Sequence, residues 1–254
     1  MKLMCRWLYL LFFWCSLCAA QAAPAAPASF MERTHSATAM PGYFPLFWDA
    51  KAGKLLMQID GPKWGTEFLF LDSLPAGVGS NDLGLDRGQL GQGRVVKFER
   101  VGPKVLLVQV NYGFRADSAN PAERKSVEDA FAQSVLAGFK IEAEDDGRVL
   151  VDATEFLTSD VHGVAETLER SGQGKFKLDE SRSAIYLPAT KNFPQNTEVE
   201  ATLTFAADEP GKVGEFVRAV VPNPQSVTVR EHYSFIQLPD AGLHRLGFSF
   251  RYKT

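Results

Sequence analysis

Residues 94–110 read RVVKFERVGPKVLLVQV, and this stretch decides the fold class. Arg94–Val101 and Lys104–Val110 are short apolar runs rich in valine, with Gly102-Pro103 between them. Runs of this composition on either side of a Gly/Pro break predict two strands joined as a hairpin. Because a hairpin pairs its strands in opposite directions, we expect an antiparallel sheet.

Similar runs occur on both sides of this hairpin and extend the predicted sheet. They are Tyr43–Trp48, Lys54–Ile59, Glu67–Leu71, Ala184–Leu187, Glu198–Phe205 and Ser226–Leu238. The last run is long enough to bend or to contain a β-bulge. With the helices described next, the pattern predicts an α+β fold, a mainly antiparallel β-sheet of hairpins with one or two packed helices.

Residues 120–138 carry the clearest helix signals in the chain. These are Asn120 as N-cap, Pro121 at the first position, Glu123 in the capping-box position, an apolar stripe of Val127, Phe131 and Val135, and Gly138 as terminator. Because the stripe is aliphatic and aromatic, it indicates a helix that packs on the sheet rather than a cofactor site.

A second hairpin is predicted around Asp145-Asp146-Gly147. With a three-residue loop and a left-handed Gly147, Glu144 faces Arg148. One face of the hairpin then carries Ile141, Ala143, Val149 and Val151. A two-residue turn instead places Ile141 opposite Asp152 and spoils that face, so the longer loop is preferred.

Asp160–Arg170 predicts a second, weaker helix, in which Gly163 lowers the helix propensity and Gly172 ends the helix. The inward positions are Val161, Val164 and Leu168. His162 and Glu166 lie four residues apart on it and offer two metal ligands on one face. A metal site needs at least a third ligand, so a surface His/Glu pair is the preferred interpretation.

Residues 1–22 have the parts of a secretory signal peptide. Lys2 and Arg6 supply positive charge, Trp7–Cys18 is almost wholly apolar, and Ala20-Gln21-Ala22 fits the cleavage rule. The apolar stretch is too short to span a bilayer, which needs about 20 residues, so we expect an exported, periplasmic or extracellular protein that is not in the membrane after cleavage. All 3 cysteines leave with this segment, so the predicted mature chain has none.

The remaining chain divides into three predicted parts. Residues 23–40 are rich in Ala, Pro, Ser and Thr and predict a flexible leader. Residues 41–240 form a single β-rich domain, and residues 241–254 form a divergent tail. The whole chain has 27 Lys+Arg against 30 Asp+Glu, a net charge of -3, which lacks the basic field of a nucleic-acid-binding protein.

Residues 77–93, GVGSNDLGLDRGQLGQG, contain six glycines. The loop lacks the Gly-Lys-Ser/Thr ending of a phosphate loop and opens no helical pattern, so we predict a long ordered loop with positive-φ positions and no bound cofactor. Its candidate structural or partner-contact residues are Asn81, Asp82, Asp86 and Arg87. An internal ion pair that holds the loop is favoured, and contact with a partner stays open as the alternative.

The histidines do not specify a catalytic or metal site. They are His35, His162, His232 and His244, and the chain has no HExxH, HxH or GxSxG motif. His232 lies within a predicted strand and is expected to be half-buried there rather than to act as a base. We therefore predict no catalytic, cofactor-binding or metal-binding residues.

Five segments together resemble a known family. They are 77–89 (GVGSNDLGLDRGQ), 94–105 (RVVKFERVGPKV), 147–156 (GRVLVDATEF), 181–186 (SRSAIY) and 193–200 (FPQNTEVE). In this order they resemble the domain of unknown function that precedes the HExxH catalytic domain in large exported bacterial zinc-dependent metalloproteases. The resemblance runs from about Gly42 to Asp240, nearly the whole predicted mature chain.

The resemblance implies a non-catalytic module, a scaffold or prosegment-like part that packs against a metalloprotease catalytic domain. The zinc-binding helix of that family lies downstream, so no zinc ligand is carried over, and we expect a truncated or split form. The alternative is a stand-alone periplasmic module whose glycine-rich loop contacts a peptide or glycan. A third and weaker alternative is a small hydrolase that uses carboxylates.

Overall fold

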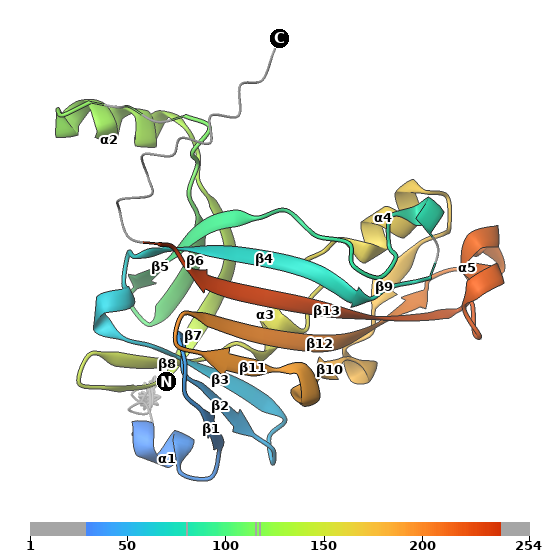
Figure 1. Ribbon diagram of the computed structural model, residues 1–254, viewed down its shortest axis with the longest axis horizontal. Coiled ribbons are helices and arrows are strands. Elements are labelled where there is room, and N and C mark those ends of the chain that lie inside the picture. The colour runs from blue at the N-terminus through green and yellow to red at the C-terminus, as the bar shows by residue number, and fades with distance from the viewer. Residues whose placement is uncertain (1–28, 80, 115, 117, 240–254) are drawn as a thin grey trace, which may run out of the picture.

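The computed structural model describes residues 29–239 except Ser80, Arg115 and Asp117 (Figure 1). The predicted signal peptide, the first part of the leader, the tail at 241–254 and His244 lie outside the described residues. Within the described part of the chain, no helix is long and apolar enough to cross a membrane.

The described residues form a 13-stranded sheet in which the paired strands run antiparallel, as the sequence predicts. Its order is β1 (Thr38–Met40), β2 (Leu46–Asp49), β3 (Lys54–Ile59), β8 (Arg148–Asp152), β7 (Ser134–Asp145), β6 (Lys104–Gln109), β5 (Arg94–Val101), β4 (Glu67–Ala76), β13 (Ser226–Gln237), β12 (Asn196–Ala207) and β10 (Ala184–Ile185), with β9 (Phe176–Leu178) and β11 (Lys191–Phe193) also on β12. The helices are α1 (Phe30–Thr34), α2 (Pro121–Ala130), α3 (Thr154–Leu157), α4 (Val164–Arg170) and α5 (Glu215–Val220). The predicted α+β fold class is confirmed.

The sheet curls so that its two ends meet. The Tyr43 N–H, just before β2, donates to the Phe193 carbonyl of β11 at 2.7 Å. The Asn192 side chain donates to the carbonyls of Met40 and Phe44, both at 2.8 Å. Gly42 makes this closure possible, because a Cβ there would lie 1.9 Å from the Asn192 side-chain oxygen. The strands at the start of the chain are therefore fastened to strands near its end.

The curled sheet encloses an aromatic core. Five phenylalanines, each at most 1% exposed, fill its centre: Phe44, Phe68, Phe70, Phe98 and Phe235. Phe44 contacts Phe68 and Phe98 edge to face, with ring centroids 5.0 and 5.3 Å apart. Aromatic pairs in this geometry add to the stabilisation from burial, so the cluster joins Phe44, just before β2, to the strands β4, β5 and β13.

The prediction of a flexible leader over 23–40 is wrong for residues 29–40, which form α1 and β1. Ser29 and Glu32 make a reciprocal capping box at the start of α1. Phe30 covers a second apolar cluster on the outer face of the sheet, where it meets Leu56 and Leu150. The composition of this segment, rich in Ala, Pro, Ser and Thr, did not indicate a helix, because the helix is stabilised by its capping box and by the burial of a single aromatic residue, Phe30.

The predicted helix over 120–138 is half right. Asn120 caps α2 and Pro121 opens it, but the helix ends at Ala130 because Phe131 is extended. Val135 and Gly138 belong to β7, so the apolar spacing of four crosses from helix to strand. Glu123 accepts from the Ser118 hydroxyl rather than completing a capping box. The predicted packing on the sheet is also wrong, since α2 buries no residue and projects from the body beyond β6 and β7 (Figure 1).

The β7–β8 hairpin has the two-residue turn that the sequence analysis rejected. Asp145 pairs with Arg148, and Asp146 and Gly147 take positive φ angles of 46° and 75°. A register shift between Ile141 and Ala143 then places Ile141 opposite Val151. The bulge puts Ala143 into the outer cluster and leaves Ile141 on the main core, an outcome that strict alternation could not anticipate.

Candidate functional site

The described residues of the glycine-rich loop have positive φ at Gly79, Gly84 and Gly88, as predicted. Its apolar residues anchor it, because Val78, Leu83 and Leu85 are buried in the main core. The Val78 N–H donates to the Leu85 carbonyl at 2.7 Å. A Cβ on Gly77 would lie 2.0 Å from that same carbonyl oxygen, so glycine is required there.

The internal ion pair predicted for this loop is wrong. Asp86 accepts a hydrogen bond from the Gln89 side chain at 2.6 Å instead. Asn81 begins a short 3-10 turn, Asn81–Leu83, and Asp82 is exposed on it. Arg87 is exposed too, and among the described residues no ion pair joins it to either aspartate. Apolar anchors and backbone bonds hold the loop, which leaves Arg87 available for another contact.

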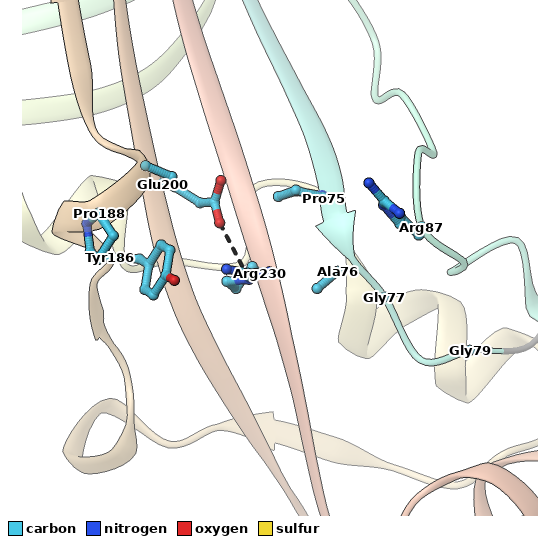
Figure 2. Close-up of a pocket in the computed structure, with 10 residues that line it drawn as sticks. Pro75, Ala76, Gly77, Gly79, Arg87, Tyr186, Pro188, Glu200 and Arg230 are labelled. Atoms are coloured by element: carbon cyan, nitrogen blue, oxygen red, sulfur yellow. Dashed lines mark ion pairs between the residues drawn. The ribbon is translucent and has the colours of Figure 1, made fainter.

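Arg87 lies at the rim of a cleft of about 660 Å³ (Figure 2). The end of β4 and the glycine-rich loop form one wall, the 3-10 turn Leu187–Ala189 forms the other, and β12 and β13 form the floor. The lining residues are Pro75, Ala76, Gly77, Gly79, Arg87, Tyr186, Pro188, Ala189, Glu200 and Arg230. Of the candidate residues whose side chains the structure describes, Asp82, Asp86 and Arg87, only Arg87 lines this cleft.

On the floor of the cleft, Arg230 is held between the carboxylate of Glu200 and the aromatic ring of Tyr186. Arg230 Nε lies 3.3 Å from Glu200 Oε1, and the Glu200 side chain is only 6% exposed. The Arg230 guanidinium stands over the Tyr186 ring, 4.7 Å from its centroid. The Tyr186 N–H in turn donates to the Glu200 carbonyl at 2.6 Å. These contacts hold Arg230 in one orientation between a carboxylate and an aromatic face.

The polar surface continues along β12 and β13 beyond the cleft. His232 Nε2 lies 2.8 Å from Glu198, and its Nδ1 lies 3.5 Å from Glu200. The hydrogen bond to Glu198 raises the pKa of His232, although burial opposes it. Burial raises the pKa of Glu198, but hydrogen bonds from His232, Ser234 and Asn196 outweigh it and the net shift is downward. His232 is half-buried on a strand, as predicted.

A second polar cluster lies on the opposite, buried face of the sheet. Asp72 on β4 is enclosed, with Arg94 Nη1 at 2.7 Å and His162 Nδ1 at 2.8 Å. Burial raises the pKa of Asp72, but these two partners outweigh it and the pKa falls below its usual value. The predicted surface pair of His162 and Glu166 is wrong, because His162 points inward to Asp72 while the exposed Glu166 faces Arg170.

Glu231 on β13 belongs to the same cluster and, like Asp72, is fully buried. Glu231 Oε2 accepts hydrogen bonds from the Tyr233 hydroxyl at 3.0 Å and from the backbone N–H of His162 at 3.2 Å. Burial, reinforced by the charge of Asp160, raises the pKa of Glu231 to about 9. Glu231 is therefore protonated at neutral pH. Its Oε1 has no donor beside it, and a proton there completes a hydrogen bond to Asp160.

Asp160 also determines where α4 begins. Its carboxylate accepts from the N–H groups of Gly163, Val164 and Ala165, so the helix starts at Val164, later than the predicted Asp160. Gly163 is the N-cap with φ 81°, not an interior helix residue. The predicted helix is therefore confirmed in kind, and a side-chain cap shortens it by one turn.

Comparison with known families matches residues 88–246 to the family described as Domain of unknown function (DUF5117). This is more than half of the chain. The chain belongs to the DUF5117 family. No curated protein and no solved structure matches it. The DUF5117 match contains α2, most of the cleft floor and most of the buried cluster, and it begins one residue after Arg87.

Sequence reasoning missed the buried cluster of this DUF5117 chain because its members are scattered. Asp72 and Arg94 come from neighbouring strands, whereas His162 and Glu231 lie far along the chain. One signal was present: Glu231 occupies an inward position between Val229 and Tyr233 in an alternating strand. Among the residues described, no group of three or more His, Cys, Asp or Glu side chains is placed to hold a metal ion.

Proposed function

We propose that this chain is a non-catalytic module of an exported zinc-metalloprotease-like protein that packs against the HExxH catalytic domain as a scaffold or prosegment-like part. Two observations support the proposal: the resemblance of the five sequence segments, and a projecting arm with an exposed apolar surface. The signal-like residues 1–22 support export to the periplasm or the medium.

The arm, defined here as the described residues of 111–133 with α2 at its centre, is the observation that carries the proposal. Phe114 and Phe131 stack in parallel with ring centroids 4.0 Å apart, yet they are 55% and 38% exposed. Val135, near the start of β7, is 57% exposed. Exposed aromatic and aliphatic side chains that cluster on a projection are typical of a protein–protein contact. The occupant we propose is the catalytic domain.

The test uses the mature chain together with the separately purified HExxH domain of a metalloprotease whose N-terminal region belongs to DUF5117. We expect a one-to-one complex in light scattering and calorimetry. The double variant Phe114→Ser/Phe131→Ser should weaken it at least tenfold, because aromatic anchors carry much of the energy of such contacts. Val101→Ser is the matched control, since Val101 is also 55% exposed but lies at the β5–β6 turn.

Three outcomes would contradict this proposal. The first is a double variant that binds as tightly as the parent chain, and the second is a parent chain that does not bind. The third is chelator-sensitive cleavage of casein by the mature chain alone, since we propose that catalysis belongs to the partner.

A second candidate function is a stand-alone exported module that binds a peptide or a glycan. The cleft at the glycine-rich loop favours it, because the volume of about 660 Å³ is in the range of ligand-binding pockets. The exposed Arg87 at its rim supplies a polar contact that the fold itself does not use.

A further inference from the structure

We propose that this cleft binds the carboxylate of a short peptide segment, with Arg87 as the residue that binds the anion. The inference rests on the second candidate function and names its ligand class. It is independent of the arm, which lies on a different part of the molecule (Figure 1).

The first argument for a carboxylate ligand comes from the charges in the cleft. Three lining residues are charged: Arg87, Arg230 and Glu200. Glu200 already pairs with Arg230 on the floor, at 3.3 Å. Arg87 stands across Pro75 and Ala76 from that pair, and no ion pair within the described chain engages it (Figure 2). The cleft therefore holds one uncompensated positive charge, which matches one carboxylate.

The second argument for a peptide ligand comes from the apolar walls of the cleft. Pro75 and Ala76 at the end of β4 face Pro188 and Ala189 across the cleft, and all four have small or rigid apolar side chains. Such walls can pack against a peptide with short side chains, and they contain no charged group that would compete with Arg87 for its carboxylate. Gly77 and Gly79 continue the first wall with no side chain, so a ligand can approach the loop backbone closely.

The aromatic residue argues against a neutral glycan. Sugar recognition relies on an open ring face, and Tyr186 is the aromatic residue that lines the cleft. Arg230 already occupies a face of that ring at 4.7 Å from the centroid. The cleft therefore offers a cation and apolar walls rather than a stacking platform.

The experiment measures binding of four probes to the mature chain by calorimetry. Two carry a carboxylate, acetyl-Ala-Pro-Ala-Glu-amide and acetyl-Ala-Pro-Ala-Ala with a free C-terminus. Acetyl-Ala-Pro-Ala-Ala-amide and maltose are neutral. We expect at least one carboxylate peptide to bind at least tenfold more tightly than the amide and than maltose. Which of the two binds more tightly identifies the source as a side chain or a chain terminus.

Variants of Arg87 locate the site. Arg87→Ala should weaken the carboxylate peptide about tenfold, Arg87→Lys should restore part of the loss, and the thermal midpoint should stay unchanged. Arg124→Ala, an exposed arginine on α2, is the matched control and should bind as the parent chain does.

The outcomes separate this inference from the arm. Equal binding of the amide, tighter binding of maltose, or full affinity in Arg87→Ala would overturn it. Peptide binding should survive in Phe114→Ser/Phe131→Ser, and binding of the catalytic domain should survive in Arg87→Ala, so either proposal can fail while the other stands.

Discussion

The two faces of β13 treat charge in opposite ways. The inward residues Glu231 and Tyr233 are fully buried, whereas Arg230, His232 and Ser234 between and beside them are only partly covered. On the inner face the acid Glu231 keeps its proton, because its pKa is raised to about 9. On the outer face the acids of β12 remain paired with Arg230 and His232. Burial beside another acid suppresses the charge of Glu231, whereas the equally buried Asp72 keeps its charge because Arg94 and His162 pair with it.

The two histidine–carboxylate pairs sharpen the comparison. His162–Asp72 inside and His232–Glu198 outside have the same separation of 2.8 Å. The inner side chains are 8% and 1% exposed, and the outer ones are 24% and 14% exposed. The two pairs therefore contribute differently to the free energy of unfolding although their distances are equal, because water screens the outer pair more than the inner one.

The largest effect is expected for Asp72→Asn. The change leaves Arg94 and His162 buried beside a neutral group, and removal of one member of a buried charge pair typically costs about 3–5 kcal/mol. The matched outer-face control is Glu198→Gln, for which about 1 kcal/mol is expected. Urea unfolding at pH 7 measures both. Equal losses would show that burial does not distinguish the two faces.

The next effect is a change in pH dependence in Glu231→Gln. The unfolded carboxyl titrates near 4.5 and the folded one near 9, so the folded state binds the proton more tightly. Parent-chain stability is thus complete below pH 4.5 and declines as pH rises toward 9, by on the order of 3 kcal/mol at pH 7. Glutamine keeps a carbonyl acceptor and an uncharged donor in place of those of the protonated acid, and it does not titrate.

Denaturant unfolding from pH 4.5 to 9 checks this. We expect Glu231→Gln to match the parent chain at pH 4.5 and to exceed its stability at pH 8. Parallel curves for the two proteins would mean that Glu231 is already ionised in the folded state.

The smallest effect concerns His232→Gln on the outer face. The folded pKa of His232 lies above its usual 6.5, so its contribution is complete below pH 6.5 and is lost as pH rises through the folded pKa. Because water partly screens this pair, a loss of about 1 kcal/mol or less is expected between pH 6 and 8. The variant should lack this part of the pH dependence, and thermal melts of both proteins across that range measure it. If titration of His232 cost more folding stability than titration of Glu231, the predicted ranking of the inner face above the outer face would be wrong.

Much of the sheet could be predicted from the sequence because its strands follow local rules. Lys54–Ile59 and Arg94–Val101 have the predicted bounds, because each is a short run of strand-forming residues that is flanked by turn residues. The strand that was expected to bend or to contain a β-bulge, β13, has a register shift against β4 between Arg230 and His232. These features depend on neighbouring residues, which a single sequence displays.

The errors arose where tertiary contacts decide the outcome. The capped helix at residues 29–34 depends on Phe30 reaching Leu56 and Leu150, which its local composition does not show. The rejected turn at Asp146-Gly147 became acceptable through a bulge between Ile141 and Ala143 on β7, the strand that leads into the turn. For the cleft, the sequence indicated Arg87 within the right loop, but Glu200 and Arg230 come together only through the pairing of β12 with β13.

The junction between the two ends of the sheet also sets the timing of folding. The bonds from Asn192 to Met40 and Phe44 span 152 and 148 residues of chain, and the one from Phe44 to Thr197 spans 153. As the chain emerges N-terminus first, β1 and β2 must wait for residues near 197 before they can be fastened. Folding that depends on such distant partners is slow, so β1, β2 and β3 can pair with one another early but the sheet closes only when nearly the whole domain has been made.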